Sequence, residues 1–159
     1  MSASSLFLLL RLGEDRYAID AGSVIEVLPI VRLKIIPCAP AGVAGMMSFR
    51  GSAIPVMDLS VIAFGTATPQ RMMTRIVVVR YEPVAQGEDS GLLGLIVPEV
   101  MQTAHLDASR FESMGIRNER ARYLGPVLTT NDGMLQQLLI PALLNEEVRN
   151  ALFQSVIAA

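Results

Sequence analysis

Residues 43–59 read Val43-Ala44-Gly45-Met46-Met47-Ser48-Phe49-Arg50-Gly51-Ser52-Ala53-Ile54-Pro55-Val56-Met57-Asp58-Leu59. Two apolar runs, 43–49 and 52–59, flank the Arg50-Gly51 pair, and this pattern predicts a β-hairpin. Gly51 allows the tight bend that such a turn requires. The turn would hold Arg50 at the surface, where its guanidinium can bind a carboxylate with two hydrogen bonds. An ordinary hairpin arginine is the competing interpretation, and the residue pattern alone favours it.

Strand-like runs dominate the rest of the chain. Residues 6–12 and 16–20 surround a Gly-Glu-Asp turn and predict an opening hairpin. Asn131-Asp132-Gly133 separates runs 127–130 and 134–140, and Asp-Gly between such runs is a strong hairpin signal. Further strands are expected at 32–36, 75–81, 92–97 and 100–106. About nine or ten short strands, with turns every eight to twelve residues, predict a barrel or a sandwich.

Helix is expected in three places. Val24, Val27 and Leu28 recur at helical spacing, which predicts a helix over 21–28. Residues 60–64 predict a short helical turn. Residues 142–153 predict an amphipathic C-terminal helix, because apolar side chains recur there every four residues. The polar stretch 82–91 is expected to be a loop, and 107–123 a loop with one helical turn.

Length and composition limit the class of protein. A chain of 159 residues fits one compact domain, 1–159. Hydrophobic residues make up 52% and charged residues 18%, which excludes a disordered chain. No apolar run approaches the roughly twenty residues of a membrane span, so no direct membrane insertion is expected. The first ten residues lack a basic segment typical of signal peptides, and a cytoplasmic location is expected.

The charge balance argues against nucleic acid as a partner. Thirteen basic and fifteen acidic residues give a net charge of -2, without the basic surplus that nucleic-acid binding needs. A nucleic-acid-binding barrel of SH3 or OB type would also use stacked aromatic side chains. This chain has three Tyr, five Phe and no Trp. We therefore rank that alternative low.

The search for catalytic chemistry finds no constellation. Cys38 and His105 are each the only residue of their type, which excludes an internal disulfide and a cysteine-rich zinc site. There is no P-loop, Gly-x-Gly-x-x-Gly or Gly-x-Ser-x-Gly pattern. Glu146 and Glu147 point about 100° apart on a helix and cannot converge on one substrate. The sequence predicts no enzyme activity, no cofactor and no metal. The nine methionines are expected mainly in the core, or in an adaptable protein-binding surface where exposed.

The central window resembles the signature of CheW-like domains, the coupling proteins of bacterial chemosensory arrays. The resemblance rests on Gly45-Met46-Met47-Ser48-Phe49-Arg50-Gly51 followed by Ile54-Pro55-Val56-Met57-Asp58-Leu59. Other family-like segments occur in the expected order at 8–13, 17–20, 24–28, 36–37, 76–79, 94–97 and the final Asp-Gly hairpin. Each segment is a weak signal, but the ordered set is specific and covers nearly the whole chain.

This resemblance implies a mainly β fold of two small SH3-like, five-stranded β-barrels that share a hydrophobic core, with a C-terminal α-helix. It also implies a non-enzymatic adaptor without cofactors. Such proteins join the cytoplasmic tip of a chemoreceptor to the regulatory domain of a CheA-type histidine kinase, which has the same fold. A small-molecule-binding or catalytic β-barrel stays open as the alternative.

The resemblance also implies a receptor-binding surface. Val24, Glu26, Gly45, Arg50 and Gly51 match family positions that contact the receptor or support that surface. Three further residues align with an apolar groove that takes the receptor helix; they are Leu8, Val27 and Val100. The opposite charges of Glu26 and Arg50 lead us to expect an ion pair. Kinase contacts are expected on exposed strand edges and loops of one barrel.

The chain departs from the family pattern at several positions. Ser48 replaces the usual asparagine, Phe49 the usual leucine, and Pro98 a frequent aspartate. The loop after Leu106 is rich in arginine and glutamate. These departures are typical of a divergent copy, similar to those of surface-sensing, Wsp-type systems that drive cyclic-di-GMP signalling.

Overall fold

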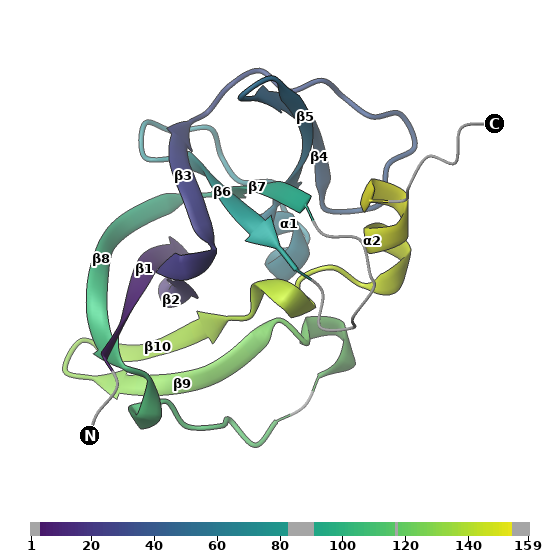
Figure 1. Ribbon diagram of the computed structural model, residues 1–159. Coiled ribbons are helices and arrows are strands. Elements are labelled where there is room, and N and C mark those ends of the chain that lie inside the picture. The colour runs from purple at the N-terminus through teal and green to yellow at the C-terminus, as the bar shows by residue number, and fades with distance from the viewer. Residues whose placement is uncertain (1–3, 83–90, 117, 154–159) are drawn as a thin grey trace.

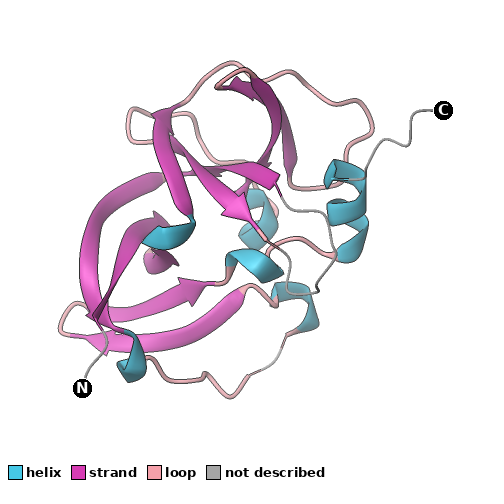
Figure 2. Ribbon diagram, in the orientation of Figure 1, coloured by secondary structure: helices cyan, strands magenta, loops and turns pink. Residues whose placement is uncertain are grey.

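The computed structural model describes residues 4–82, 91–116 and 118–153 (Figure 1). Figure 2 shows a mainly β chain with short helices between and beside the strands. The strands are β1 (Ser4–Leu12), β2 (Asp15–Asp20), β3 (Val24–Pro29), β4 (Val43–Phe49), β5 (Ser52–Asp58), β6 (Arg75–Tyr81), β7 (Gly91–Val97), β8 (Glu99–Asp107), β9 (Leu124–Thr130) and β10 (Gly133–Leu138). The α-helices are α1 (Leu59–Phe64) and α2 (Glu146–Phe153), and the 3-10 turns are η1 (Ala21–Ser23), η2 (Ala108–Arg110), η3 (Glu119–Ala121) and η4 (Ile140–Ala142).

The described strands form two five-stranded sheets. The first has the order β8-β1-β2-β10-β9, and the second has the order β3-β6-β7-β5-β4. The predicted hairpins β1–β2, β4–β5 and β9–β10 are all present as antiparallel pairs. Each sheet also contains one parallel pair, β2 with β10 and β5 with β7. The second sheet is inserted in the chain between β2 and β8 of the first.

Each sheet is closed by the segment that follows one edge strand. After β3, Lys34 exchanges two backbone hydrogen bonds of 2.8 Å with Met46 on β4, the opposite edge. After β8, Glu112 exchanges two such bonds of 2.8 Å with Val127 on β9. These bridges pair edge strands that would otherwise expose unsatisfied backbone groups. The predicted fold of two SH3-like, five-stranded barrels is confirmed, and we call the two sheets the first and second barrels.

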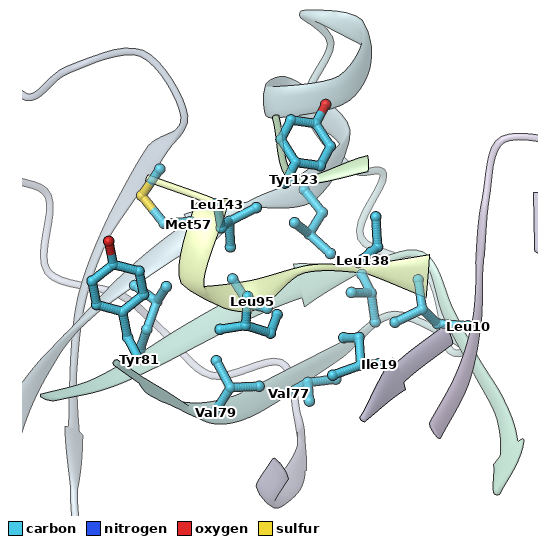
Figure 3. Packing of buried hydrophobic residues seen from close by; sticks show 14 of the residues in the cluster. Leu10, Ile19, Met57, Val77, Val79, Tyr81, Leu95, Tyr123, Leu138 and Leu143 are labelled. Atoms are coloured by element: carbon cyan, nitrogen blue, oxygen red, sulfur yellow. The ribbon is translucent and has the colours of Figure 1, made fainter. Parts of the chain in front are cut away.

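The largest hydrophobic cluster contains side chains from both barrels (Figure 3). Leu10 and Ile19 come from the first barrel, and Val77 and Leu95 come from the second; all four are fully buried. Leu143, just after η4, joins the same cluster. Burying one such side chain stabilises a fold by about 1.5–3 kcal/mol. The predicted hydrophobic core between the barrels therefore brings together strands far apart in sequence.

The predicted helix over 21–28 is wrong. Asp20 caps only the single turn η1, where its Oδ1 accepts a 2.9 Å hydrogen bond from the Gly22 N–H. Val24 then begins β3, which pairs with β6. Val24, Ile25 and Val27 are β-branched and favour a strand, and the pairing with β6 overrides the helical spacing of the apolar residues.

Three other expected elements differ in extent. The strand expected at 32–36 is reduced to the single bridge at Lys34, because prolines flank this stretch at 29 and 37. The C-terminal helix is confirmed but begins at Glu146, where Asn145 Oδ1 accepts a 2.8 Å hydrogen bond from the Val148 N–H. The stretch 107–123 contains two 3-10 turns, η2 and η3. Most of the loop expected at 82–91 lies outside the described residues.

Candidate functional site

The Arg50-Gly51 turn has an unusual backbone. Phe49 pairs with Ser52, so the loop has only two residues, and their φ angles are 49° for Arg50 and 84° for Gly51. Positive φ at both positions is the type I′ geometry that matches the twist of a hairpin. Glycine adopts it freely, but an L-residue with a side chain loses about 1–2 kcal/mol in this region. The fold therefore holds an arginine where asparagine or glycine would be the usual choice.

The ion pair expected between Glu26 and Arg50 is confirmed. Arg50 Nη2 lies 3.1 Å from Glu26 Oε2, and the two side chains are 66% and 40% exposed. The guanidinium carbon also lies 4.8 Å from the centroid of the Phe49 ring. Glu26 lies on edge strand β3 and Arg50 follows edge strand β4, so the pair spans the line where the second barrel closes. An exposed pair contributes about 0–1 kcal/mol to stability.

Gly45 supports this region from inside the barrel. It is buried on β4 with φ 152°, and a Cβ atom there would lie 2.5 Å from the Lys34 carbonyl oxygen. Lys34 carries the backbone bridge that closes the barrel. A side chain at position 45 would therefore push the closing segment away from β4. The absence of a side chain at Gly45 thus lets the closing segment pack against β4.

The apolar residues of the predicted groove differ in accessibility. Val27 on β3 is 38% exposed, whereas Leu8 on β1 is only 6% exposed and belongs to the central core. Val24 and Val100 are partly buried against the same core, and Val100 pairs with Leu10 across β1 and β8. Figure 1 shows β1, β3 and β8 on the same side of the molecule. Of these four residues, Val27 thus offers the most accessible apolar area, and Leu8 is part of the core.

A buried polar network was missed by the sequence reasoning. Asp58 Oδ1 accepts hydrogen bonds from the Ser60 N–H at 2.9 Å and from the Thr68 hydroxyl at 2.6 Å. Asp58 Oδ2 accepts a 2.9 Å bond from the Thr68 N–H. Asp58 therefore caps α1 and also fixes the loop that follows it. The available signal was an aspartate two residues before the predicted helical turn, near the typical N-cap position; the helix itself begins one residue earlier, at Leu59.

The chemical groups considered for catalysis are dispersed. Cys38 and His105 are both exposed, the first in a loop and the second on β8. Within residues 4–82, 91–116 and 118–153, no three His, Cys, Asp or Glu side chains gather as metal ligands would. Met47 and Met57 are buried as expected, whereas Met72 and Met73 are exposed. No helix in the described part of the chain has the length and apolar character to cross a membrane.

Comparison with known proteins identifies the family. Residues 6–148 match the sequence profile described as "CheW-like domain". The chain is 41% identical over 49 residues to "Chemotaxis protein CheW" of Treponema pallidum, a match that covers 31% of this chain and 29% of that protein. It is 31% identical over 101 residues to "Protein PilI" of Pseudomonas aeruginosa, which covers 64% of this chain and 53% of that protein. The matched regions thus span about half or less of these relatives.

The fold agrees with a solved structure over most of its length. The crystal structure of the scaffolding protein TtCheW from Thermoanaerobacter tengcongensis superposes with a TM-score of 0.76 at 25% sequence identity. The superposition covers 92% of this chain and 96% of that chain. The profile match, the two barrels and the Arg50-Gly51 hairpin agree with one another. The chain belongs to the CheW-like domain family.

Proposed function

We propose that this protein is a non-enzymatic adaptor that couples a chemoreceptor to a CheA-type histidine kinase in a bacterial chemosensory complex. The observation that carries the proposal is the exposed Glu26–Arg50 pair, held by a turn whose backbone disfavours arginine. Family membership supports it, as do the names of two similar proteins, a chemotaxis protein and a scaffolding protein.

The receptor would bind through the surface around Arg50. Val27 offers exposed apolar area, with Val24 and Val100 beside the core, and the Glu26–Arg50 pair supplies a charged rim. A partly apolar surface with a charged rim suits one face of an amphipathic helix. Arg50 can exchange its bond to Glu26 for a carboxylate of the receptor, because an exposed ion pair is weak. Gly45, Gly51 and Leu8 would act by shaping this surface.

The kinase would bind elsewhere on the molecule. An adaptor must hold both partners at once, so the kinase surface cannot coincide with the receptor surface. A regulatory domain built from the same type of barrel would meet exposed loops and strand edges of one barrel. We therefore expect substitutions at Arg50 to weaken receptor coupling while leaving binding to the isolated kinase regulatory domain unchanged.

Co-sedimentation tests the coupling function. Membranes that contain a chemoreceptor from the same bacterium are mixed with a CheA-type kinase from that bacterium, with or without the protein, and then pelleted. We expect the kinase to pellet with receptor membranes only when the protein is present. Kinase that pellets equally without the protein would contradict the proposal. So would a protein that binds neither the receptor membranes nor the kinase.

A further inference from the structure

One end of the second barrel carries a concentration of positive charge. We call residues 30–36 and 65–75 the basic end. These segments contain Arg32, Lys34, Arg71 and Arg75 but no aspartate or glutamate, although the whole chain has a net charge of -2. A positive region on an acidic protein attracts acidic partners and excludes basic ones. The basic end is thus locally positive although the chain as a whole is slightly negative.

These charges are available to a partner. Arg32, Lys34 and Arg71 are exposed, and Arg75 is half-buried with Nη1 donating to the Thr74 carbonyl. In the part of the chain that the structure describes, the ion pairs join Arg11 to Glu99 and Arg50 to Glu26. None of these basic side chains is in an ion pair with a described carboxylate, and the one carboxylate that lines the groove, Asp58, is almost fully buried and accepts hydrogen bonds from Ser60 and Thr68.

A groove lined by both apolar and polar side chains separates the two segments of the basic end. The groove has a volume of about 550 Å³. Its walls include Ile30, Val31 and Leu33 on one side and Ala67, Thr68 and Gln70 on the other. The same two segments also carry large exposed apolar side chains, since Ile35 is 76%, Met72 is 93% and Met73 is 53% exposed. Exposed apolar groups beside a groove with polar edges mark an interaction surface.

The loop that presents the two methionines is fixed by hydrogen bonds. Asp58 holds it at Thr68, and the Thr74 hydroxyl donates a 2.7 Å bond to the Pro69 carbonyl. The Arg71 N–H in turn donates a 3.0 Å bond to the Thr74 hydroxyl oxygen. An ordered loop loses little conformational entropy when a partner binds. The flexible methionine side chains can still adapt to the shape of that partner.

The basic end is far from the Glu26–Arg50 pair. Strand β5 begins with Ser52, beside the Arg50-Gly51 turn, and ends with Asp58, which lines the groove. Six residue steps at about 3.3 Å each separate the two ends of this strand by roughly 20 Å. The Arg50 turn and the groove therefore lie at opposite ends of β5, although Val27 of the proposed receptor surface is only three residues before Ile30 of the groove.

We propose that the basic end binds an acidic segment of a protein partner, with apolar side chains entering the groove and Asp or Glu side chains pairing with Arg32, Lys34 and Arg71. The concave groove between the segments favours a protein chain over the flat surface of a bilayer. This inference goes beyond the proposed adaptor function, because it assigns a second surface and the chemistry of its partner without using Glu26 or Arg50.

Selection from a phage-displayed library of random peptides tests this proposal. Peptides are selected on the wild-type protein, and the Kd of each synthetic peptide is then measured for an Arg32→Glu/Arg71→Glu variant. An Arg120→Glu/Arg122→Glu variant is the matched control, because it makes the same change in charge at exposed arginines near the first barrel. We expect peptides that combine Asp or Glu with Leu, Ile or Phe. The Arg32→Glu/Arg71→Glu variant should bind these peptides with a Kd at least about tenfold higher than that of wild type. The Arg120→Glu/Arg122→Glu control should bind them as wild type does.

Further measurements separate the possible outcomes. Met72→Ser should also weaken peptide binding without changing the melting temperature, because this side chain is almost fully exposed. If the charge reversal unfolds the protein, Arg32→Gln/Arg71→Gln provides a milder test. Selected peptides that lack acidic residues, or that bind the variant and wild type equally, would overturn the proposal. Sedimentation with phosphatidylserine vesicles that depends on Arg32 and Arg71, without any acidic peptide, would assign the basic end to membranes instead.

Discussion

At the scale of single residues, Arg50 is the position where folding and recognition have different requirements. Its φ of 49° is one that asparagine and glycine adopt more readily. Its ion pair with Glu26 is exposed and adds at most about 1 kcal/mol. Neither the backbone angle nor the ion pair gives the fold a stability advantage for having arginine at position 50. Residues with a strained backbone are common at functional surfaces. This contrast is why we place Arg50 at the centre of the proposed receptor surface.

Two substitutions at Arg50 separate these requirements. Arg50→Ala loses the ion pair but keeps a side chain in the left-handed region, so its free energy of unfolding should fall by about 0–1 kcal/mol. Arg50→Asn also loses the pair but relieves the backbone, so it should be more stable than Arg50→Ala by up to about 1 kcal/mol. Urea denaturation measures both. A loss above about 2 kcal/mol in Arg50→Asn would make this arginine a structural residue.

At the scale of elements, the Asp58 network joins β5, α1 and the following loop. Asp58→Ala would leave the N–H groups of Ser60 and Thr68 without their acceptor, and these groups are buried. We expect it to lower the free energy of unfolding by about 2–4 kcal/mol, from a lost cap and an unsatisfied donor. Thermal denaturation and hydrogen exchange at Thr68 measure the effect.

A matched substitution elsewhere controls for the loss of an aspartate. Asp132 is exposed in the β9–β10 turn, and Asp132→Ala should change stability by less than about 0.5 kcal/mol. Equal effects of the two substitutions would show that Asp58 has no special role in holding the loop.

Sequence patterns predicted local elements better than long-range ones. The three antiparallel hairpins were predictable because their turns carry Gly-Glu-Asp, Arg-Gly and Asn-Asp-Gly between apolar runs. The parallel pair that joins Arg16 to Leu135 has no such local signal, since its strands are brought together by the core. The β3 strand was missed because a register shift between Val24 and Glu26 breaks the two-residue alternation of a strand, so the spacing of its apolar residues also fits a short helix.

The candidate site was predictable to a similar degree. Glu26 and Arg50 were paired from their charges and their place in the family-like segments. The left-handed backbone of Arg50 and the buried position of Leu8 depend on strand pairing, which the sequence does not state. The basic end was hidden because its two segments are separated in sequence by β4, β5 and α1. The net charge of the whole chain does not reveal such a local cluster of basic residues.

At the scale of the whole molecule, the shared core predicts one cooperative unfolding transition. Leu10 and Ile19 pack with Val77 and Leu95 in the largest cluster, so each barrel, although it also has a smaller cluster of its own, would expose much of its apolar surface without the other. Units this small bury a smaller fraction of their surface and are only marginally stable alone. Differential scanning calorimetry should show a single peak, and Leu10→Ala and Val77→Ala should both shift that peak. Two separated peaks would contradict the prediction of a single domain.

Buried tyrosines predict how stability changes at alkaline pH. Burial raises the pKa of Tyr17 above its ordinary value of 10.0, with Asp15 and Tyr123 adding to the shift, and burial also raises the pKa of Tyr123. A raised folded-state pKa gives stability that is complete below the unfolded-state pKa and is lost as pH rises through the folded-state pKa. Stability should therefore decline above pH 10. A Tyr17→Phe/Tyr123→Phe variant should decline less steeply in urea titrations over this range.

Receptor-dependent kinase activity tests the central claim most directly. The protein is reconstituted with receptor membranes and a CheA-type kinase from the same bacterium. The rate of kinase autophosphorylation is measured for wild type, Arg50→Ala, Glu26→Ala, the double variant and the control Arg120→Ala. We predict that wild type and the control stimulate the kinase. Each single variant should lose most of the stimulation, because a bound receptor would cover the pair, and truncating one partner of a buried, hydrogen-bonded charge pair weakens binding by at least about 30-fold. The double variant should lose less than the two single losses combined. Equal stimulation by wild type and Arg50→Ala would contradict the account.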